Sequence, residues 1–303
     1  MISRIHHILL LLLLTCSTAI CQKTLNIQDG ENIIHLEMYG KGAPMLIING
    51  GPGMSSEGFR SLAKEFGETN LAIIYDQRGT GQSTMANANA ETVKLDSMVK
   101  DIETIRQHLK IDKWVVFGQS FGGMLACYYA TKHPENTKGL ILSSSGGIDM
   151  GLFSGPSIIS SRLSQVERDS MSYWSQQIEN GDTTFHARLQ RAKFLAPAYL
   201  YDKSHVPIIA ERLTQANLQI NGLVFQDMRN IDFDCSEELK AYTKPVIIIQ
   251  GEQDVVSKSI GQKAHDVFPN SKFILLDKCG HYGWLDQHDL YFQYLHDFMA
   301  GLK

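Results

Sequence analysis

Residues 114–123 read WVVFGQSFGG. The apolar first half predicts a buried strand, and the pattern that follows predicts a helix from Ser120 to about Lys132, with Pro134 beyond its end. G-x-S-x-G between a strand and a helix is the pattern of a nucleophile elbow, where small residues let strand and helix approach closely around the serine. Ser120 is therefore the candidate nucleophile, at the amino end of a helix whose dipole favours developing negative charge. The alternative is a glycine-rich turn with a solvated serine.

Other short apolar or β-branched runs alternate with helical patterns along the chain. Several of these runs lack polar alternation, as expected for parallel strands that are buried on both faces. Predicted strands cover residues 33–38, 44–49, 71–76, 113–118, 139–143, 245–250 and 272–276, and further predicted helices cover 98–109, 257–267 and 290–299. This alternation predicts an α/β fold with a mostly parallel central sheet flanked by helices.

Residues 150–233 interrupt the alternation with many polar residues, weak helical patterns and no clear strand. We interpret this segment as a helical cap inserted into a core that residues 22–149 and 234–303 form. A cap at this place would cover the carboxyl ends of the strands, where open α/β sheets bind their ligands.

Residues 1–21 follow the order of a secretory signal peptide. Basic and histidine side chains precede an apolar run over residues 8–14, and small or polar residues follow as far as Cys21. The uncharged stretch is shorter than the roughly 18 residues that a membrane span needs, so we expect no integral membrane span. We expect cleavage before Gln22 and export to the periplasm or the medium. A lipid anchor on Cys16 or Cys21 is the alternative.

Composition and charge disfavour several classes of protein. The 303 residues are 43% hydrophobic and 20% charged, as in an ordinary globular protein. The net charge of −4, without a long run of either sign, argues against a nucleic-acid partner. The sequence carries no CxxC motif and no metal-ligand pattern, so we expect neither a metal nor a cofactor. Cys127, Cys235 and Cys279 remain after the expected cleavage and are predicted to be buried free thiols.

A serine nucleophile near neutral pH needs a general base, and the base needs an orienting acceptor. Behind a nucleophile elbow the acid comes next in the chain and the histidine last. Asp254 and His281 each lie shortly beyond a predicted strand, at the sheet edge that carries Ser120. We expect Asp254 to orient His281 and His281 to act as the general base. Glu252 is the rival acid. The rival histidines, interpreted as surface residues in or beside helices, are His133, His265 and His288.

Residues 49–53 read NGGPG and follow another predicted strand. Acyl transfer forms a tetrahedral oxyanion, which preorganised backbone N–H groups stabilise by about 3 kcal/mol each. One donor is the amide after the nucleophile, here Phe121, and the other comes from an early strand-to-helix loop. Gly51 is the candidate for the second donor, because glycine lets the main chain approach the substrate. We expect Asn49 and Gly50 to contact the substrate; the alternative is a tight turn without a catalytic role.

Five segments together resemble the proline iminopeptidase family of α/β-hydrolases: NGGPG at 49–53, DQRGTGQS at 76–83, GQSFGG at 118–123, GEQD at 251–254 and GH at 280–281. The resemblance covers most of the chain between residue 22 and the end, apart from the predicted cap. It implies an α/β-hydrolase fold and a metal-free serine hydrolase that removes an amino-terminal residue, often proline, from short peptides. DQRG is the most family-specific piece, and we expect Asp76 and Arg78 to pair and hold the loop beside the active site.

The chain departs from the family pattern at positions that touch the substrate. Family members usually begin the first loop with His, where this chain has Asn49. Peptidases of the family bind the free amine of the substrate with glutamates. One directly follows the catalytic acid, where this chain has Val255, and one lies in the cap, near Asn217 or Asn221 here. We expect Asn217 to contact the substrate. Because a buried ammonium without a carboxylate is costly, the candidate substitutes are Glu211, Asp227, Asp232 and Asp234.

The sequence thus predicts a serine hydrolase with an acyl-enzyme mechanism that acts on a small molecule or a short peptide. The first hypothesis is release of amino-terminal residues such as proline from small peptides or amides. The alternative is a carboxylesterase or lactone hydrolase for an uncharged small acyl substrate, which the missing glutamates favour. A catalytically silent binding protein is disfavoured, because all three catalytic positions hold suitable residues. The serine in the elbow disfavours an epoxide hydrolase, and the sequence leaves the oligomeric state open.

Overall fold

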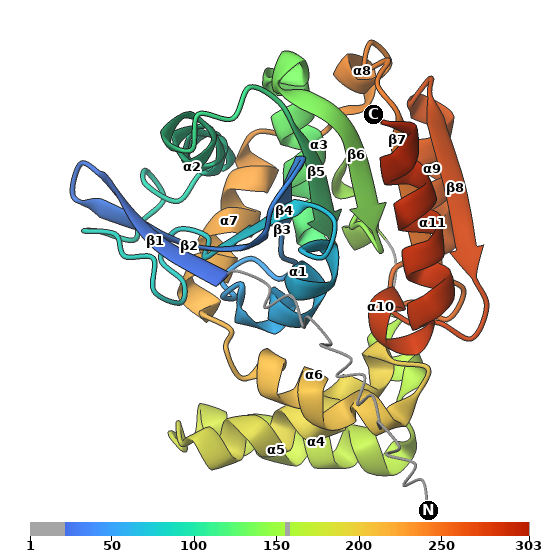
Figure 1. Ribbon diagram of the computed structural model, residues 1–303. Coiled ribbons are helices and arrows are strands. Elements are labelled where there is room, and N and C mark those ends of the chain that lie inside the picture. Colours follow the sequence, from blue (N-terminus) through green and yellow to red (C-terminus); the bar gives the residue numbers. More distant parts are fainter. Residues whose placement is uncertain (1–21, 155–157, 303) are drawn as a thin grey trace, which may run out of the picture.

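The computed structural model describes residues 22–154 and 158–302 of the chain (Figure 1). The predicted signal peptide and its alternative, the lipid anchor, lie outside the described residues, so export stays a prediction. Among the residues that the structure describes, no helix has the length and apolar character to cross a bilayer.

Eight strands form one sheet in the order β1-β2-β4-β3-β5-β6-β7-β8. β2 runs antiparallel to its neighbours β1 and β4, and the other neighbouring pairs are parallel. The strands are β1 (Gln22–Asp29), β2 (Asn32–Gly40), β3 (Pro44–Ile48), β4 (Leu71–Tyr75), β5 (Trp114–Gln119), β6 (Thr137–Ser143), β7 (Val246–Gly251) and β8 (Ser271–Leu276). The prediction of a mostly parallel sheet is confirmed.

β1 departs from the sequence-based expectation, because no strand is predicted before residue 33. Within β1 only Ile27 is buried, and most of its other residues are polar and exposed. Its backbone nevertheless pairs with β2 from Gln22 to Asp29. An edge strand that faces water on most positions lacks the apolar pattern from which strands are predicted.

Side chains alternate between the two faces of a sheet, and here each face carries an apolar core. In β5, Trp114 and Val116 belong to one core, and Val115 and Phe117 belong to the other. The first face is covered by α2 (Leu95–His108), α3 (Phe121–Lys132), α8 (Ser236–Leu239) and α9 (Lys258–Val267), and the second by α1 (Arg60–Phe66), α10 (Gly283–Asp286) and α11 (His288–Gly301) (Figure 1). The sheet is therefore the middle layer of three.

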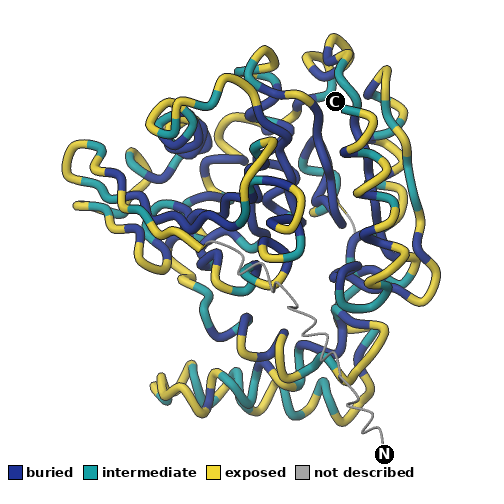
Figure 2. Tube along the Cα trace, viewed as in Figure 1, coloured by how far each residue is buried: buried dark blue, intermediate teal, exposed yellow. Residues whose placement is uncertain are grey.

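The segment expected to form the cap contains four α-helices and no strand among its described residues. They are α4 (Gln165–Glu179), α5 (Phe185–Leu195), α6 (Val206–Leu213) and α7 (Leu218–Asn230). α4, α5 and α6 form a layer at one end of the molecule, and α4 buries none of its residues (Figure 2). α7 differs, because its Ile220, Val224 and Met228 lie in the same core as α2.

The predicted free thiols are confirmed: Cys127, Cys235 and Cys279 are buried and make no disulfide. Burial raises the pKa of the Cys235 thiol to about 12 and that of the other two thiols further. A thiol that stays protonated is a poor nucleophile, so these cysteines act as small apolar side chains.

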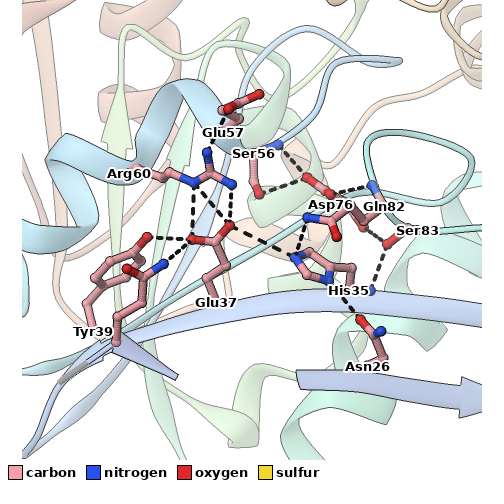
Figure 3. A network of polar contacts seen from close by, with 11 residues as sticks. Asn26, His35, Glu37, Tyr39, Ser56, Glu57, Arg60, Asp76, Gln82 and Ser83 are labelled. Carbon is pink, nitrogen blue, oxygen red and sulfur yellow. Dashed lines mark hydrogen bonds and ion pairs between the residues drawn. The ribbon is translucent and has the colours of Figure 1, made fainter. Parts of the chain in front are cut away.

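A buried polar network ties the antiparallel end of the sheet to α1 (Figure 3). At its centre the Glu37 carboxylate of β2 accepts hydrogen bonds from Arg60 of α1, with 2.6 Å between Nη2 and Oε1, and from the Tyr39 hydroxyl. His35, two residues earlier on the same strand, bonds Asn26 of β1 at 2.7 Å. Glu37 is nearly inaccessible to water, so these partners replace its hydration.

The expected pairing of Asp76 with Arg78 is wrong. The Asp76 carboxylate accepts from the backbone amides of Ser56 and Gln82 (Figure 3), whereas Arg78 pairs with Asp101 of α2, with 2.7 Å between Nη2 and Oδ1. Burial raises the pKa of Asp101 to about 6, although the Arg78 charge acts to lower it. Asp76 and Arg78 are thus held by different partners. Both contacts fix the loop that follows β4.

Replacing Glu37 by Gln tests the network. Burial acts to raise the pKa of Glu37, but the hydrogen bonds from Arg60 and Tyr39 outweigh it and lower that pKa. The charged form therefore stabilises the fold above the unfolded-state pKa of about 4.3, and that stability is lost as the pH falls through the lower folded-state value. At pH 7 we expect urea titration to show a loss of about 1–3 kcal/mol in the free energy of unfolding. The difference in the free energy of unfolding between wild type and Glu37→Gln should shrink on acidification.

The exposed Glu31→Gln is the matched control. Equal stability of Glu37→Gln and wild type at pH 7 would contradict a stabilising role for this network.

Candidate active site

Ser120 lies between the end of β5 and the start of α3 with a φ of 54°, in the left-handed region that non-glycine residues rarely adopt. A methyl group on Gly118 would come within 2.3 Å of the Gly122 carbonyl oxygen, and one on Gly122 within 2.1 Å of the Ile48 carbonyl oxygen. These clashes would be with backbone, so no side-chain rotation relieves them. The two glycines therefore permit the tight strand-to-helix turn expected of a nucleophile elbow.

Asp254 follows β7 and His281 follows β8, and the structure brings the two side chains together. His281 Nδ1 lies 2.7 Å from Asp254 Oδ1, which also accepts from the Val256 amide at 3.1 Å. Both residues are buried, with 6% and 4% of their surface exposed. With Nδ1 directed at the carboxylate, Nε2 is the ring nitrogen left for proton exchange. His281 and Ser120 line the same cavity.

The rival acid and bases lie elsewhere. Glu252 is exposed and pairs with Lys258 at 3.8 Å. None of the rival histidines lines the cavity, and each faces another partner: His133 faces Glu135, His265 bonds Ser271, and His288 faces Glu65 and Asp289. The interpretation of these histidines as non-catalytic is consistent with these positions.

The loop over residues 49–53 lies directly against the elbow. A methyl group on Gly50 would come within 2.7 Å of Ser120 Cβ, and Gly51 has a φ of 71° that suits glycine. Among the described residues, the amides of Gly51 and Phe121 donate no hydrogen bond to the protein. Two free donors beside the nucleophile fit the predicted oxyanion site.

The Asn49 side chain does not reach the cavity. Asn49 is fully buried, and its Nδ2 donates to the carbonyl oxygens of Gly50 and Met54, both at 3.1 Å. Neither Asn49 nor Gly50 lines the cavity that holds Ser120. Both residues thus shape the loop beside Ser120, and their contacts with substrate stay a prediction.

Asn217 and Asn221, at the amino end of α7 in the segment expected to form the cap, also hold this loop. The Asn217 side chain caps α7 by accepting from the amides of Gln219 and Ile220, while its backbone amide donates to the Gly53 carbonyl at 2.7 Å. Asn221 Nδ2 donates to the Pro52 carbonyl at 2.9 Å. Neither asparagine lines the cavity. Asn217 thus has a structural role in this loop, and its contact with substrate stays a prediction.

The cavity in front of Ser120 has a volume of about 750 Å³. Its apolar lining comes from Leu152, Phe153, Ile158, Ile159, Val255, Val256 and Ile260, and its polar lining from Ser120, Ser154, Tyr199, Ser257, Ser259 and His281. No carboxylate belongs to this lining in the described parts of the chain. The candidate acidic substitutes lie elsewhere: Glu211 and Asp232 are exposed, Asp227 bonds the Leu95 amide and Asp234 bonds the Ser236 amide.

Two residues that the sequence patterns do not reveal position the His281 loop. The Tyr199 carbonyl accepts from the His281 amide at 2.7 Å, and the two rings lie 5.5 Å apart. The Asp286 carboxylate accepts from the amides of Gly280, Tyr201 and Asp202 at 2.7–3.0 Å. Burial raises the pKa of the Tyr199 hydroxyl, so this group stays protonated at the cavity wall. No local motif marks these residues, because their roles arise only when residues 199–202 dock on the core.

Within residues 22–154 and 158–302, no group of three or more His, Cys, Asp or Glu side chains is arranged to hold a metal ion. The chemistry that the described site can perform with its own groups is nucleophilic attack by a serine, proton transfer by a histidine and stabilisation of an oxyanion.

Replacing Asn217 by Ala separates a structural role from substrate binding. We expect a loss of about 1 kcal/mol in the free energy of unfolding, because the amino terminus of α7 loses its cap. KM should stay within about twofold of wild type, because the side chain does not face the cavity. Asn217→Ser, which can still cap the helix, is the matched control. An unchanged stability with a severalfold higher KM would show that the side chain binds substrate instead.

Comparisons with known proteins agree with this fold. The family model described as the alpha/beta hydrolase fold matches residues 43–287. The proline iminopeptidase of Lactobacillus helveticus (strain DPC 4571) is 28% identical over 282 residues, covering 81% of this chain and 90% of the relative. The proline iminopeptidase of Heyndrickxia coagulans is 26% identical over 283 residues, covering 87% and 92%.

Among solved structures, an alpha/beta fold family hydrolase from Bacillus anthracis str. Sterne has a TM-score of 0.76 at 21% identity, covering 91% of this chain and 99% of that chain. At this identity the likeness shows the fold alone. The family match extends over most of the chain and contains all three candidate catalytic residues. The chain belongs to the α/β-hydrolase fold family, with proline iminopeptidases among its relatives.

Proposed function

We propose that this protein is a serine hydrolase that cleaves small amides and esters through an acyl-enzyme on Ser120. The observation that carries the proposal is the convergence of three separate segments. Ser120 at the elbow and His281 line one cavity, and His281 is hydrogen-bonded to Asp254 at 2.7 Å. This arrangement supports a nucleophile, a general base and a residue that orients the base.

In the proposed reaction, Ser120 Oγ attacks the substrate carbonyl while His281 Nε2 takes the hydroxyl proton. The amides of Gly51 and Phe121 stabilise the oxyanion that forms. His281 then gives the proton to the leaving amine or alcohol as the C–N or C–O bond breaks. A water molecule then attacks the acyl carbon while His281 Nε2 takes its proton, and the bond between the acyl carbon and Ser120 Oγ breaks as His281 returns the proton to Oγ. Asp254 accepts the hydrogen bond from His281 Nδ1 and stabilises the imidazolium.

For the acyl group, release of an amino-terminal residue such as proline is the leading candidate. Curated proline iminopeptidases align with this chain over most of both lengths. The apolar wall of the cavity, which includes Leu152 and Ile260, suits a compact ring of this kind. The acyl side of the substrate would then lie between the cap segment and α9.

A carboxylesterase or lactone hydrolase is the second candidate, and one specific observation favours it. No carboxylate lines the described cavity, so a charged substrate amine would lose its hydration without gaining a counter-ion. An uncharged acyl group carries no such cost.

Replacing Ser120 by Ala removes the proposed nucleophile. We expect turnover of any amide or ester substrate to fall by about 10⁴-fold or more, as for removal of other serine nucleophiles. The melting temperature should not fall, because one oxygen at the cavity wall is lost and no core contact changes. Turnover is measured with a chromogenic ester and an arylamide. A variant that retains wild-type turnover of both would exclude the acyl-enzyme.

A panel of three compounds tests the acyl group: a prolyl arylamide, its N-acetylated form and a short-chain aryl ester. If the leading candidate holds, we expect the prolyl arylamide to be cleaved and N-acetylation to lower kcat/KM by about a hundredfold or more, because binding of the free amine is lost. The second candidate needs no free amine, so it predicts a loss of less than about tenfold. Cleavage of the N-acetylated compound at a rate close to that of the free amine would exclude the leading candidate. Cleavage of the ester alone would select the second candidate.

A further inference from the structure

Arg212, on α6 of the cap, is buried with only 4% of its surface exposed. Carboxylates pair with Arg60, Arg78 and Arg106, but no ion pair holds Arg212 in the described part of the chain. Its guanidinium instead donates from Nη2 to the Gly50 carbonyl at 2.8 Å and lies 4.7 Å from the ring centre of Phe59. The Nε and Nη1 atoms are buried without a hydrogen-bond partner among the described residues.

An unpaired buried cation is expensive, and removal of its hydration costs several kcal/mol in general. Arg212 is therefore poorly explained as a stabilising residue. It is not among the residues that line the cavity holding Ser120. What it does contact is one carbonyl of the loop beside the nucleophile.

The position of that carbonyl matters because it shares a peptide group with the Gly51 amide. In a trans peptide the C=O and the N–H point in opposite directions, and resonance couples them electronically. The described residues contain no cis peptide. A cation on the Gly50 oxygen thus draws electron density from the Gly51 nitrogen and directs its N–H away from α6. That N–H becomes a stronger and better oriented donor.

We propose that Arg212 is a positioning residue that orients and polarises the Gly50–Gly51 peptide for stabilisation of the oxyanion. The proposal rests on the proposed function, in which Gly51 is an oxyanion donor. A guanidinium keeps its charge at all ordinary pH values, so the effect is permanent and needs no proton transfer. Asn49 Nδ2 donates to the same carbonyl at 3.1 Å, so a cation and an amide together fix the peptide plane.

The packing around Arg212 leaves the guanidinium little freedom. A methyl group on Gly58 would come within 2.8 Å of Nη1, and one on Gly50 within 2.1 Å of the Gln119 side-chain oxygen. Gln77 Nε2 donates to the carbonyl of Asn49 at 2.9 Å, immediately before the critical peptide. The loop and the guanidinium are therefore held in one arrangement, as preorganised catalysis requires.

Three substitutions at one position test the proposal. Arg212→Met keeps an unbranched apolar stem against Phe59 and removes the charge, Arg212→Gln keeps a neutral donor, and Arg212→Lys keeps a charge. The matched control is Gln215→Ala, which removes another cap contact, that with the Ser55 hydroxyl at 3.0 Å, without touching Gly50. Each variant is compared with wild type and Ser120→Ala in kcat, KM and affinity for a trifluoromethyl ketone, which forms a charged tetrahedral adduct on a catalytic serine.

We expect Arg212→Met and Arg212→Gln to lower kcat/KM about tenfold with KM within about twofold, less than the loss of a whole oxyanion donor. Affinity for the ketone should fall by the same factor, because only the tetrahedral state uses the donor. Arg212→Lys should recover at least part of both losses. Gln215→Ala should resemble wild type. If Arg212→Met does not fold, Arg212→Gln tests the proposal by the same measurements of kcat/KM, KM and affinity for the ketone.

Wild-type kcat/KM and ketone affinity in Arg212→Gln would overturn the proposal. So would an equal loss in Gln215→Ala, which would make the effect a general disturbance of the cap. Full turnover in Ser120→Ala would instead remove the acyl-enzyme and this proposal with it. Loss of turnover in Ser120→Ala, with no effect in the Arg212 variants, would leave the proposed function intact and reject only the role of Arg212.

Discussion

A serine with a positive φ at the end of a buried strand can persist only where neighbouring backbone segments approach without side chains between them. Here Gly118 and Gly122 leave that space, and a methyl group on either would collide with backbone atoms. The turn raises Ser120 to the sheet edge at which β7 and β8 also end. Asp254 and His281 then meet by the ordinary geometry of parallel strands. The proposed chemistry thus depends first on the absence of side chains at Gly118 and Gly122, because without that space Ser120 could not adopt this turn.

The cap contacts two parts of the proposed active site, the loop that carries His281 and the loop over residues 49–53. On one side the Tyr199 carbonyl holds the His281 amide. On the other side Arg212 and Asn217 hold the carbonyls of Gly50 and Gly53. Because α4 buries none of its own residues, the cap layer depends on its neighbours for support. Its docking contacts and the geometry of the site are therefore coupled: a shift of the cap would move the loop over residues 49–53 and the loop that carries His281 together.

The sequence predicted what local patterns encode. Apolar runs located the buried strands, and G-x-S-x-G with the order of acid and histidine selected residues that the structure brings to one place. The sequence-based predictions were wrong or incomplete where the structure depends on contacts between residues far apart in the chain. β1 is polar and becomes a strand only by pairing with β2, and Asp76 bonds Ser56 and Gln82 and not Arg78. Arg212 looks like any polar residue of a surface helix until the fold places it against Gly50.

The most direct test of the central claim is active-site labelling. A fluorophosphonate reacts covalently with a serine only where a base and an oxyanion site activate it, and mass spectrometry of the digested protein identifies the modified residue. We expect one phosphonyl group per chain, on the peptide that contains Ser120, and a labelling rate that falls steeply when His281 is replaced by Ala. Absence of label, or label on another residue at the same rate, would contradict this expectation.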